Sequence, residues 1–147
     1  FYFNDKERTS ALISICSLLN ILLPVSQPNK KIYSSFENLI KSINLDYWIF
    51  IYIFFEINLI KELGYDANLT ELSKNNTNKK ELIKIKIDGY IYEIPSYLIY
   101  NKVPKNFTNT IIRKSLNFTR QMMLNKFFIP NNLLFPKSRI ILENYFN

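Results

Sequence analysis

The sequence contains no histidine, a single cysteine and only 2 glycines among its 147 residues. Without histidine it lacks the side chain that most often moves protons at neutral pH, and also the imidazole ligand of many metal sites. Cys16 alone cannot form a disulfide within the chain or a multi-cysteine metal site. These absences argue against a catalytic triad and a zinc centre. We expect a protein that is not an enzyme and that holds no metal or cofactor.

Apolar and aromatic residues, by contrast, are abundant. They make up 48% and 16% of the chain, which is typical of a folded globule and not of a disordered segment. The length suits one domain with a substantial core. The many Asn, Lys and Ile residues are typical of an AT-rich genome, so lysine content alone carries little functional weight. We therefore expect a single domain over residues 1–147.

The most apolar stretch covers residues 43–65. Its apolar residues recur at helical spacing on nearly every side, which predicts a helix surrounded by the rest of the protein. Asp46 is the expected N-cap, and Gly64 is the expected end because glycine readily adopts a left-handed conformation. A membrane span would need about 20 predominantly apolar residues, and charged residues interrupt this run. We expect no membrane partner.

One carboxylate lies in the middle of this predicted helix. Glu56 is flanked by Phe55 and Ile57, and a charge in such surroundings needs a partner. Its own helix offers no basic residue one turn away. We expect Glu56 to be a structural buried charge that pairs with an arginine of the fourth helix described below, or with backbone amides.

Four further helices are predicted around the central one. Apolar residues at three- and four-residue steps indicate helices over residues 5–23 and 28–43. Cys16 falls among the apolar residues of the first, so we expect it to be buried. A fourth helix is expected from Thr108 or Asn109 to residue 129, and a short one near Pro136. Short turns between the first three predict an antiparallel bundle.

A β-hairpin is predicted between the third and fourth helices. Residues 66–81 are polar and indicate a loop, and residues 82–94 then alternate apolar and polar side chains. Asp88-Gly89 is the dipeptide of a two-residue hairpin turn. The isoleucines of the first strand should face the bundle and its lysines the solvent. The predicted fold is mainly α, an antiparallel helical bundle with a loop and β-hairpin inserted at about residues 66–95.

The net positive charge of the chain comes entirely from its second half. Residues 1–65 hold 6 basic and 6 acidic side chains, and of the totals of 19 and 12 the remainder hold 13 and 6. A polyanion should therefore bind in the second half. The side chains predicted to contact the phosphates of such a polyanion are Lys84, Lys86, Arg113, Lys114, Arg120, Lys126, Lys137 and Arg139. A solvated, lysine-rich surface without a ligand is the alternative.

Three segments together resemble one known family. The run Phe55-Glu56-Ile57-Asn58-Leu59-Ile60-Lys61-Glu62-Leu63-Gly64-Tyr65 resembles Phe-Glu-x-x-Leu-Leu-x-x-Leu-Gly-Tyr of the RecO family, bacterial recombination-mediator and DNA-repair proteins. Phe118-Thr119-Arg120 and Lys137-Ser138-Arg139 are similar to the closing elements of that family. Leu18-Leu19 to Leu23-Pro24, followed by Gln27-Pro28, is similar to its first helix of this region. The order and spacing agree over nearly the whole chain.

The resemblance implies a two-part protein, an amino-terminal OB-type barrel followed by a helical domain, of which only the helical domain is expected here. It implies binding to single- and double-stranded DNA, annealing of strands, and contact with the acidic tail of single-stranded-DNA-binding protein. It also implies action with RecR to load RecA in the cytoplasm. Two departures matter. Leu69 to Lys80 lacks the zinc-module cysteines of many relatives, and Phe54 stands where relatives tend to carry a basic residue.

Three functional hypotheses follow, and we expect the first two to hold together. In the first, the hairpin and the fourth helix bind DNA. In the second, the chain is a protein-interaction scaffold that binds an acidic-hydrophobic peptide in an apolar pocket with an arginine at its rim, and the OB domain handles DNA. In the third, an aromatic surface attaches the domain to membranes.

Overall fold

The computed structural model describes residues 5–23, 29–65, 68–69, 71 and 80–147. Its helices are α1 (Lys6–Leu22), α2 (Lys30–Ser42), α3 (Trp48–Glu62), α5 (Ser96–Tyr100), α6 (Asn109–Met123) and α7 (Lys137–Asn144). A π-helical turn, η1 (Leu124–Phe128), extends α6, and strands β1 (Leu82–Ile87) and β2 (Tyr90–Pro95) form one antiparallel pair. The prediction of a mainly helical fold with a small hairpin is confirmed. Most of the predicted loop at 66–81 lies outside the described residues.

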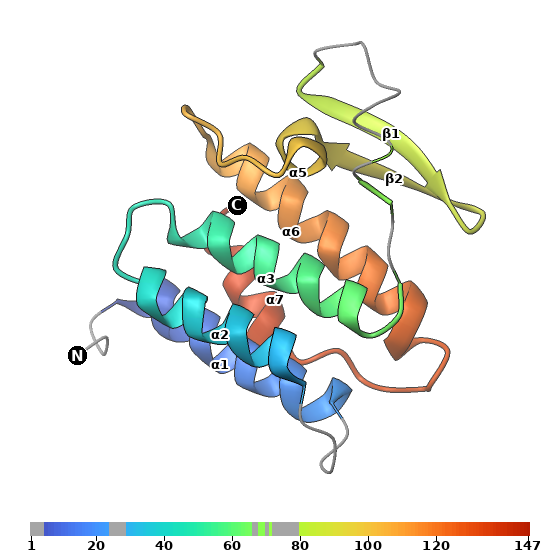
Figure 1. Cartoon of the computed structure of the whole chain (residues 1–147), viewed down its shortest axis with the longest axis horizontal. Helices are drawn as coiled ribbons and strands as arrows, with labels where there is room; N and C mark the ends of the chain where they lie inside the picture. Colours follow the sequence, from blue (N-terminus) through green and yellow to red (C-terminus); the bar gives the residue numbers. More distant parts are fainter. Residues whose placement is uncertain (1–4, 24–28, 66–67, 70, 72–79) are drawn as a thin grey trace.

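Helix α3 lies at the centre of the molecule (Figure 1). It packs against α2 on one side and against α6 on another. Helix α7 packs against both α1 and α6. The hairpin covers α6 through β2. Nine of the 15 residues of α3 are buried, which explains why its apolar residues occur on nearly every side. Among the described residues, no helix is long and apolar enough to cross a membrane.

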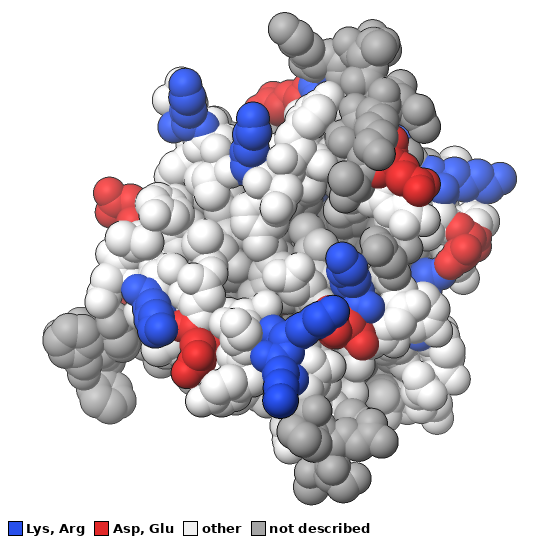
Figure 2. All heavy atoms as spheres, in the orientation of Figure 1, with Lys and Arg blue, Asp and Glu red and all other residues white. Residues whose placement is uncertain are grey.

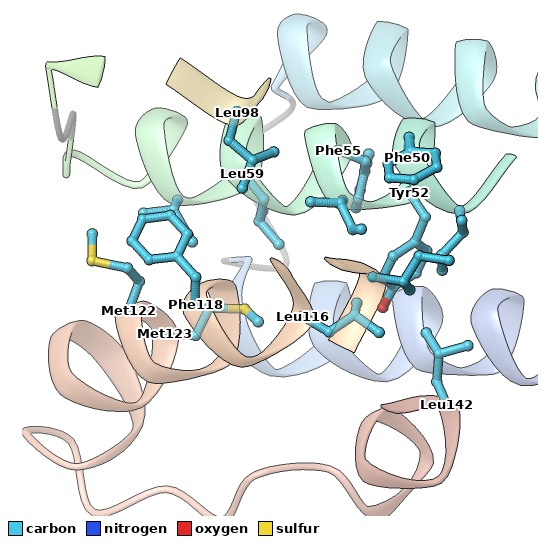
Figure 3. Close-up of a cluster of buried hydrophobic side chains, with 14 of the residues drawn as sticks. Phe50, Tyr52, Phe55, Leu59, Leu98, Leu116, Phe118, Met122, Met123 and Leu142 are labelled. Carbon is cyan, nitrogen blue, oxygen red and sulfur yellow. The ribbon is translucent and has the colours of Figure 1, made fainter. Parts of the chain in front are cut away.

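The core forms where α3, α6 and α7 meet. Figure 3 shows Leu59 of α3 pointing toward α6, which carries Leu116 and Phe118, and Leu142 of α7 lies at the other end of the cluster, below Tyr52. All five side chains are almost fully buried. The buried residues of α6 recur at three- and four-residue steps, which match the helical turn, so one face of this helix is turned to the core.

Side-chain caps begin three of the helices. Side chains of Asp5, Asn29 and Thr108 cap α1, α2 and α6 by accepting backbone N–H bonds. The prediction that Asp46 caps α3 is wrong. Residue 47 occupies that position, and the preceding turn satisfies the free N–H groups, for example that of Trp48 by the carbonyl of residue 45 at 3.1 Å. The helix does end at a glycine, at Gly64, with φ of +103°.

The prediction that Cys16 is buried is also wrong, because its side chain is exposed. Helix α1 instead turns Ala11, Ser14, Ile15 and Leu18 inward, and its contacts are mainly with α7. The apolar stripe of α1 is wide, and only the position of a distant helix decides which side of it is covered.

The hairpin turn has the predicted geometry. Asp88 and Gly89 have φ of +49° and +87°, and positive φ at both central residues is the mark of a type I′ turn. Tyr92 of β2 is buried and its ring meets that of Phe118 at 5.8 Å. The connection between the hairpin and α6 is partly helical, because it contains α5.

Candidate functional site

A cluster of buried polar side chains surrounds Glu56. Its Oε2 accepts hydrogen bonds from Arg139 Nε at 2.6 Å and from the Tyr52 hydroxyl at 3.0 Å. Its Oε1 accepts from Arg139 Nη2 at 2.9 Å and from Thr119 Oγ1 at 2.7 Å. All four residues are buried, with 0% exposure. The predicted structural role of Glu56 therefore has a concrete form, since each carboxylate oxygen is satisfied twice.

Arg139 is the inner cation of this cluster. Its Nη2 also donates to the Leu116 carbonyl at 2.9 Å, and its Nη1 to Glu143 at 3.2 Å. Burial works against its charge, but Glu56 outweighs that effect, so the pKa of Arg139 is raised. The assignment of Arg139 to DNA contact is wrong, because no part of its side chain reaches solvent. The expected arginine partner of Glu56 comes from α7, and the fourth helix contributes Thr119 instead.

Arg120 on α6 is held at the edge of the same cluster. Its Nε donates to Glu143 at 2.9 Å and its Nη2 to Asn117 at 2.7 Å. The guanidinium of Arg120, a predicted phosphate ligand, is thus already bonded within the protein. Arg113, also a predicted phosphate ligand on α6, is half-buried and forms no ion pair with a carboxylate in the described part of the chain.

Two of the predicted lysines bind carboxylates of the hairpin. Lys114 on α6 forms an ion pair with Glu93 at 2.6 Å, and this hydrogen bond lowers the pKa of the Glu93 carboxyl. Lys126 in η1 forms an ion pair with Asp88 and lies 5.4 Å from the centre of the Tyr65 ring. Its side chain is only 9% exposed. Both lysines fix the hairpin onto α6 and η1.

The remaining predicted cations do not gather in one place. Lys84 and Lys86 are exposed on the outer side of β1, with Lys84 opposite Glu93 in the strand register, and Lys114 binds that same glutamate. Lys137 begins α7, which packs against α1, and Figure 1 shows the hairpin and α1 at opposite ends of the view. On the face in Figure 2, cations alternate with carboxylates. The candidate DNA surface therefore reduces to the outer hairpin face and the adjoining part of α6.

A pocket of about 420 Å³ opens between α3, α5 and α6. Its apolar wall includes Ile57, Leu98 and Phe118. Its polar groups include Asn58, the ammonium group of Lys61 and the carboxylate of Glu71. The expected arginine at the rim is not among the described residues that line it. Sequence patterns did not reveal this pocket, because its walls come from segments that are distant along the chain. In the described part of the chain, no group of three His, Cys, Asp or Glu residues could hold a metal ion.

Comparisons with known proteins decide the family. A family model described as "Recombination protein O C terminal" matches residues 4–85, more than half of the chain. The chain belongs to this family. The predicted RecO resemblance is therefore confirmed, and its motif at Phe55 to Tyr65 lies within the matched range.

Two curated relatives agree with that assignment. The DNA repair protein RecO of Ehrlichia chaffeensis (strain ATCC CRL-10679 / Arkansas) is 23% identical over an alignment of 155 positions, which covers 94% of this chain and 64% of the relative. The DNA repair protein RecO of Wolbachia pipientis subsp. Culex pipiens (strain wPip) is 31% identical over 72 residues, 48% of this chain and 30% of that protein. The chain thus spans less than two thirds of either RecO protein. No solved structure gives a significant match.

Proposed function

We propose that this chain serves DNA repair and recombination as the C-terminal part of a RecO-like mediator. The mediator binds DNA and partner proteins in the cytoplasm and thereby promotes strand annealing and RecA loading. Family membership and the names of the two relatives support a role in DNA repair. Contact with DNA by this chain rests on one observation. Lys84 and Lys86 are exposed, lie two residues apart on one strand, and form no ion pair with a described carboxylate.

The hairpin can present these two charges together. Alternate residues of a strand point to the same face, so both ammonium groups lie outside the bundle. The rigid type I′ turn and the contacts of β2 with α6 hold the strand in place. Such a surface binds phosphates through charge, without reading sequence.

Fluorescence anisotropy with a labelled oligothymidine strand tests this proposal. The double variant Lys84→Ala/Lys86→Ala should weaken binding and reduce the slope of log affinity against log salt by about 1.4, because each phosphate contact to a single strand contributes about 0.7. Lys30→Ala/Lys41→Ala on α2 is the matched control, since it removes the same charge from two other exposed lysines. Equal losses in both double variants would contradict a DNA contact at the hairpin.

The pocket beside α3 favours a second role, as the binding site for an acidic-hydrophobic peptide such as the tail of single-stranded-DNA-binding protein. Apolar walls can take the hydrophobic end of such a tail, and Lys61 provides a positive charge for its acidic part. In that case the chain acts as an interaction scaffold, for this tail and for RecR, and DNA is bound elsewhere in the protein.

A charge placed at the pocket separates the two roles. Asn58→Glu adds a negative charge to the pocket lining. It should lower the affinity for a synthetic tail peptide several-fold in anisotropy titrations, because like charges repel. Asn20→Glu is the matched control, because Asn20 is also exposed but lies on α1. If peptide binding responds to Asn58→Glu and oligothymidine binding does not, the pocket is a separate partner site. An unaffected peptide would exclude the pocket.

A further inference from the structure

Strand β1 has an outer edge that bonds to no described residue. The pair Ile87 and Tyr90 flanks the two-residue turn, and the N–H of Ser96 donates to the carbonyl of Glu81 at 2.8 Å. In an antiparallel ladder, bonded and non-bonded pairs alternate. The odd-numbered residues of β1 therefore direct their backbone groups toward β2, and the even-numbered residues direct theirs outward.

The outward groups form a short row of donors and acceptors. They belong to Leu82, Lys84 and Lys86, and none of these residues makes a backbone hydrogen bond beyond the hairpin in the described segments. An exposed strand edge of this kind is a template for another strand.

The two faces of β1 differ in chemistry. Lys84 and Lys86 are exposed on the outer face, whereas Ile83 and Ile87 are half-buried and Ile85 is 9% exposed on the inner face. Side chains of an added strand would lie about 4.5–5.5 Å from those directly opposite them. A complementary strand would therefore carry acidic residues opposite the lysines and apolar residues opposite the isoleucines.

We propose that the free edge of β1 binds an extended peptide segment in which acidic and apolar residues alternate, by strand addition. A second copy of β1 is a poor occupant, because antiparallel pairing of two such edges brings lysines close to lysines. DNA can use the ammonium groups but has no backbone amides to continue the ladder. Peptide and DNA would compete for Lys84 and Lys86, but only the peptide would form hydrogen bonds with the outward backbone groups of β1.

Backbone methylation of the ligand tests this difference. The probe is a labelled peptide of alternating valine and glutamate, titrated against the whole chain by anisotropy. In an added strand only every second N–H faces β1, so one matched peptide is N-methylated at its glutamates and another at its valines. Strand addition predicts that one methylated peptide loses about tenfold in affinity while the other retains it, because only one set of N–H groups is bonded. Equal affinities of the two would overturn the proposal.

Protein variants give a second, independent readout. Leu82→Pro removes an outward N–H at the first residue of β1, costs no bond within the hairpin and keeps both lysines. Leu82→Pro should lower the affinity for the peptide several-fold and leave the affinity for oligothymidine unchanged. Leu82→Val should leave both affinities unchanged. Circular dichroism shows whether each variant is folded. Equal peptide binding by the two Leu82 variants would overturn the proposal.

A charge swap tests the pattern even if the proline variant does not fold. The double variant Lys84→Glu/Lys86→Glu should no longer bind the valine-glutamate peptide and should bind the corresponding valine-lysine peptide instead. Failure to exchange ligands in this way would overturn the proposal. So would sedimentation of the unmodified chain as a dimer that the peptide cannot dissociate, because the edge would then be occupied by a second copy.

Discussion

Arg139 and Glu56 lie 83 residues apart in the sequence and form a two-pronged ion pair with no solvent exposure, with donor–acceptor distances of 2.6 and 2.9 Å. The pair joins α7 to α3. The same guanidinium also bonds the Leu116 carbonyl of α6, so one side chain links three helices. Because a buried charge without its partner is costly, this pair restricts how the helices can be arranged.

Removal of one partner should destabilise the protein strongly. Arg139→Met leaves Glu56 buried without its cation and should lower the free energy of unfolding by about 3–5 kcal/mol. Urea unfolding followed by the fluorescence of Trp48, the single and buried tryptophan, measures this. Arg120→Met is the control, since its partly exposed ion pair should contribute about 1 kcal/mol or less. The double variant Glu56→Leu/Arg139→Met should recover most of the loss; if it does not, packing and not charge explains the effect.

Two tyrosines should resist ionisation until the protein unfolds. Burial raises the pKa of Tyr52, and the nearby Glu56 raises it further against the opposing charge of Arg139. Burial also raises the pKa of Tyr97, whose hydroxyl donates to Ser115 at 2.6 Å. In the unfolded chain a tyrosine ionises at about pH 10. The contribution of these two neutral hydroxyls to the free energy of unfolding is therefore complete below about pH 10. It is lost as the pH rises from there toward the higher pKa values of the folded state.

Ultraviolet absorbance of tyrosinate during an alkaline titration checks this expectation. Tyr97→Phe should remove absorbance only from the late component that accompanies unfolding, because burial raises the pKa of this hydroxyl. A loss of early absorbance in Tyr97→Phe would contradict the buried environment of that hydroxyl.

The hairpin should depend on the conformation of its turn. Gly89 has φ of +87°, and an added Cβ would meet no atom within 4 Å. Gly89→Ala should therefore cost about 1–2 kcal/mol through backbone strain alone, measured by urea unfolding. Asparagine at position 88 tolerates positive φ, so Asp88→Asn loses only the ion pair with Lys126. It should therefore lower the free energy of unfolding by less than Gly89→Ala does. A larger loss in Asp88→Asn would mean that the ion pair, and not the turn, holds the hairpin.

Cys16 should react in the folded state. Its side chain is exposed, so a thiol reagent should label it fully without denaturant, and Cys16→Ser should change the free energy of unfolding by no more than about 0.5 kcal/mol. Labelling that requires urea would contradict the exposed position. Mass spectrometry of the labelled chain gives the stoichiometry.

Local patterns predicted the elements of this fold well. The central helix, the helices before it, α6 and the hairpin all arise from spacing of apolar residues or from one dipeptide, Asp88-Gly89, and these signals act over a few residues. The N-cap of α3 was missed because backbone carbonyls of the preceding turn replaced the side chain of Asp46. The predicted cationic surface was too large because sequence gives no information on which carboxylate lies near which lysine.

The sequence by itself determined that this chain is a mainly helical RecO-family domain with a basic hairpin and a buried glutamate, since periodicity, turn chemistry and a family motif are local properties. Only the tertiary structure decided that Arg139 is a core residue and Cys16 a surface residue. It also decided that Lys114 and Lys126 bind the hairpin. These outcomes depend on contacts between helices distant in the chain, where burial and pairing are set by the packing of neighbours and not by the residues beside them.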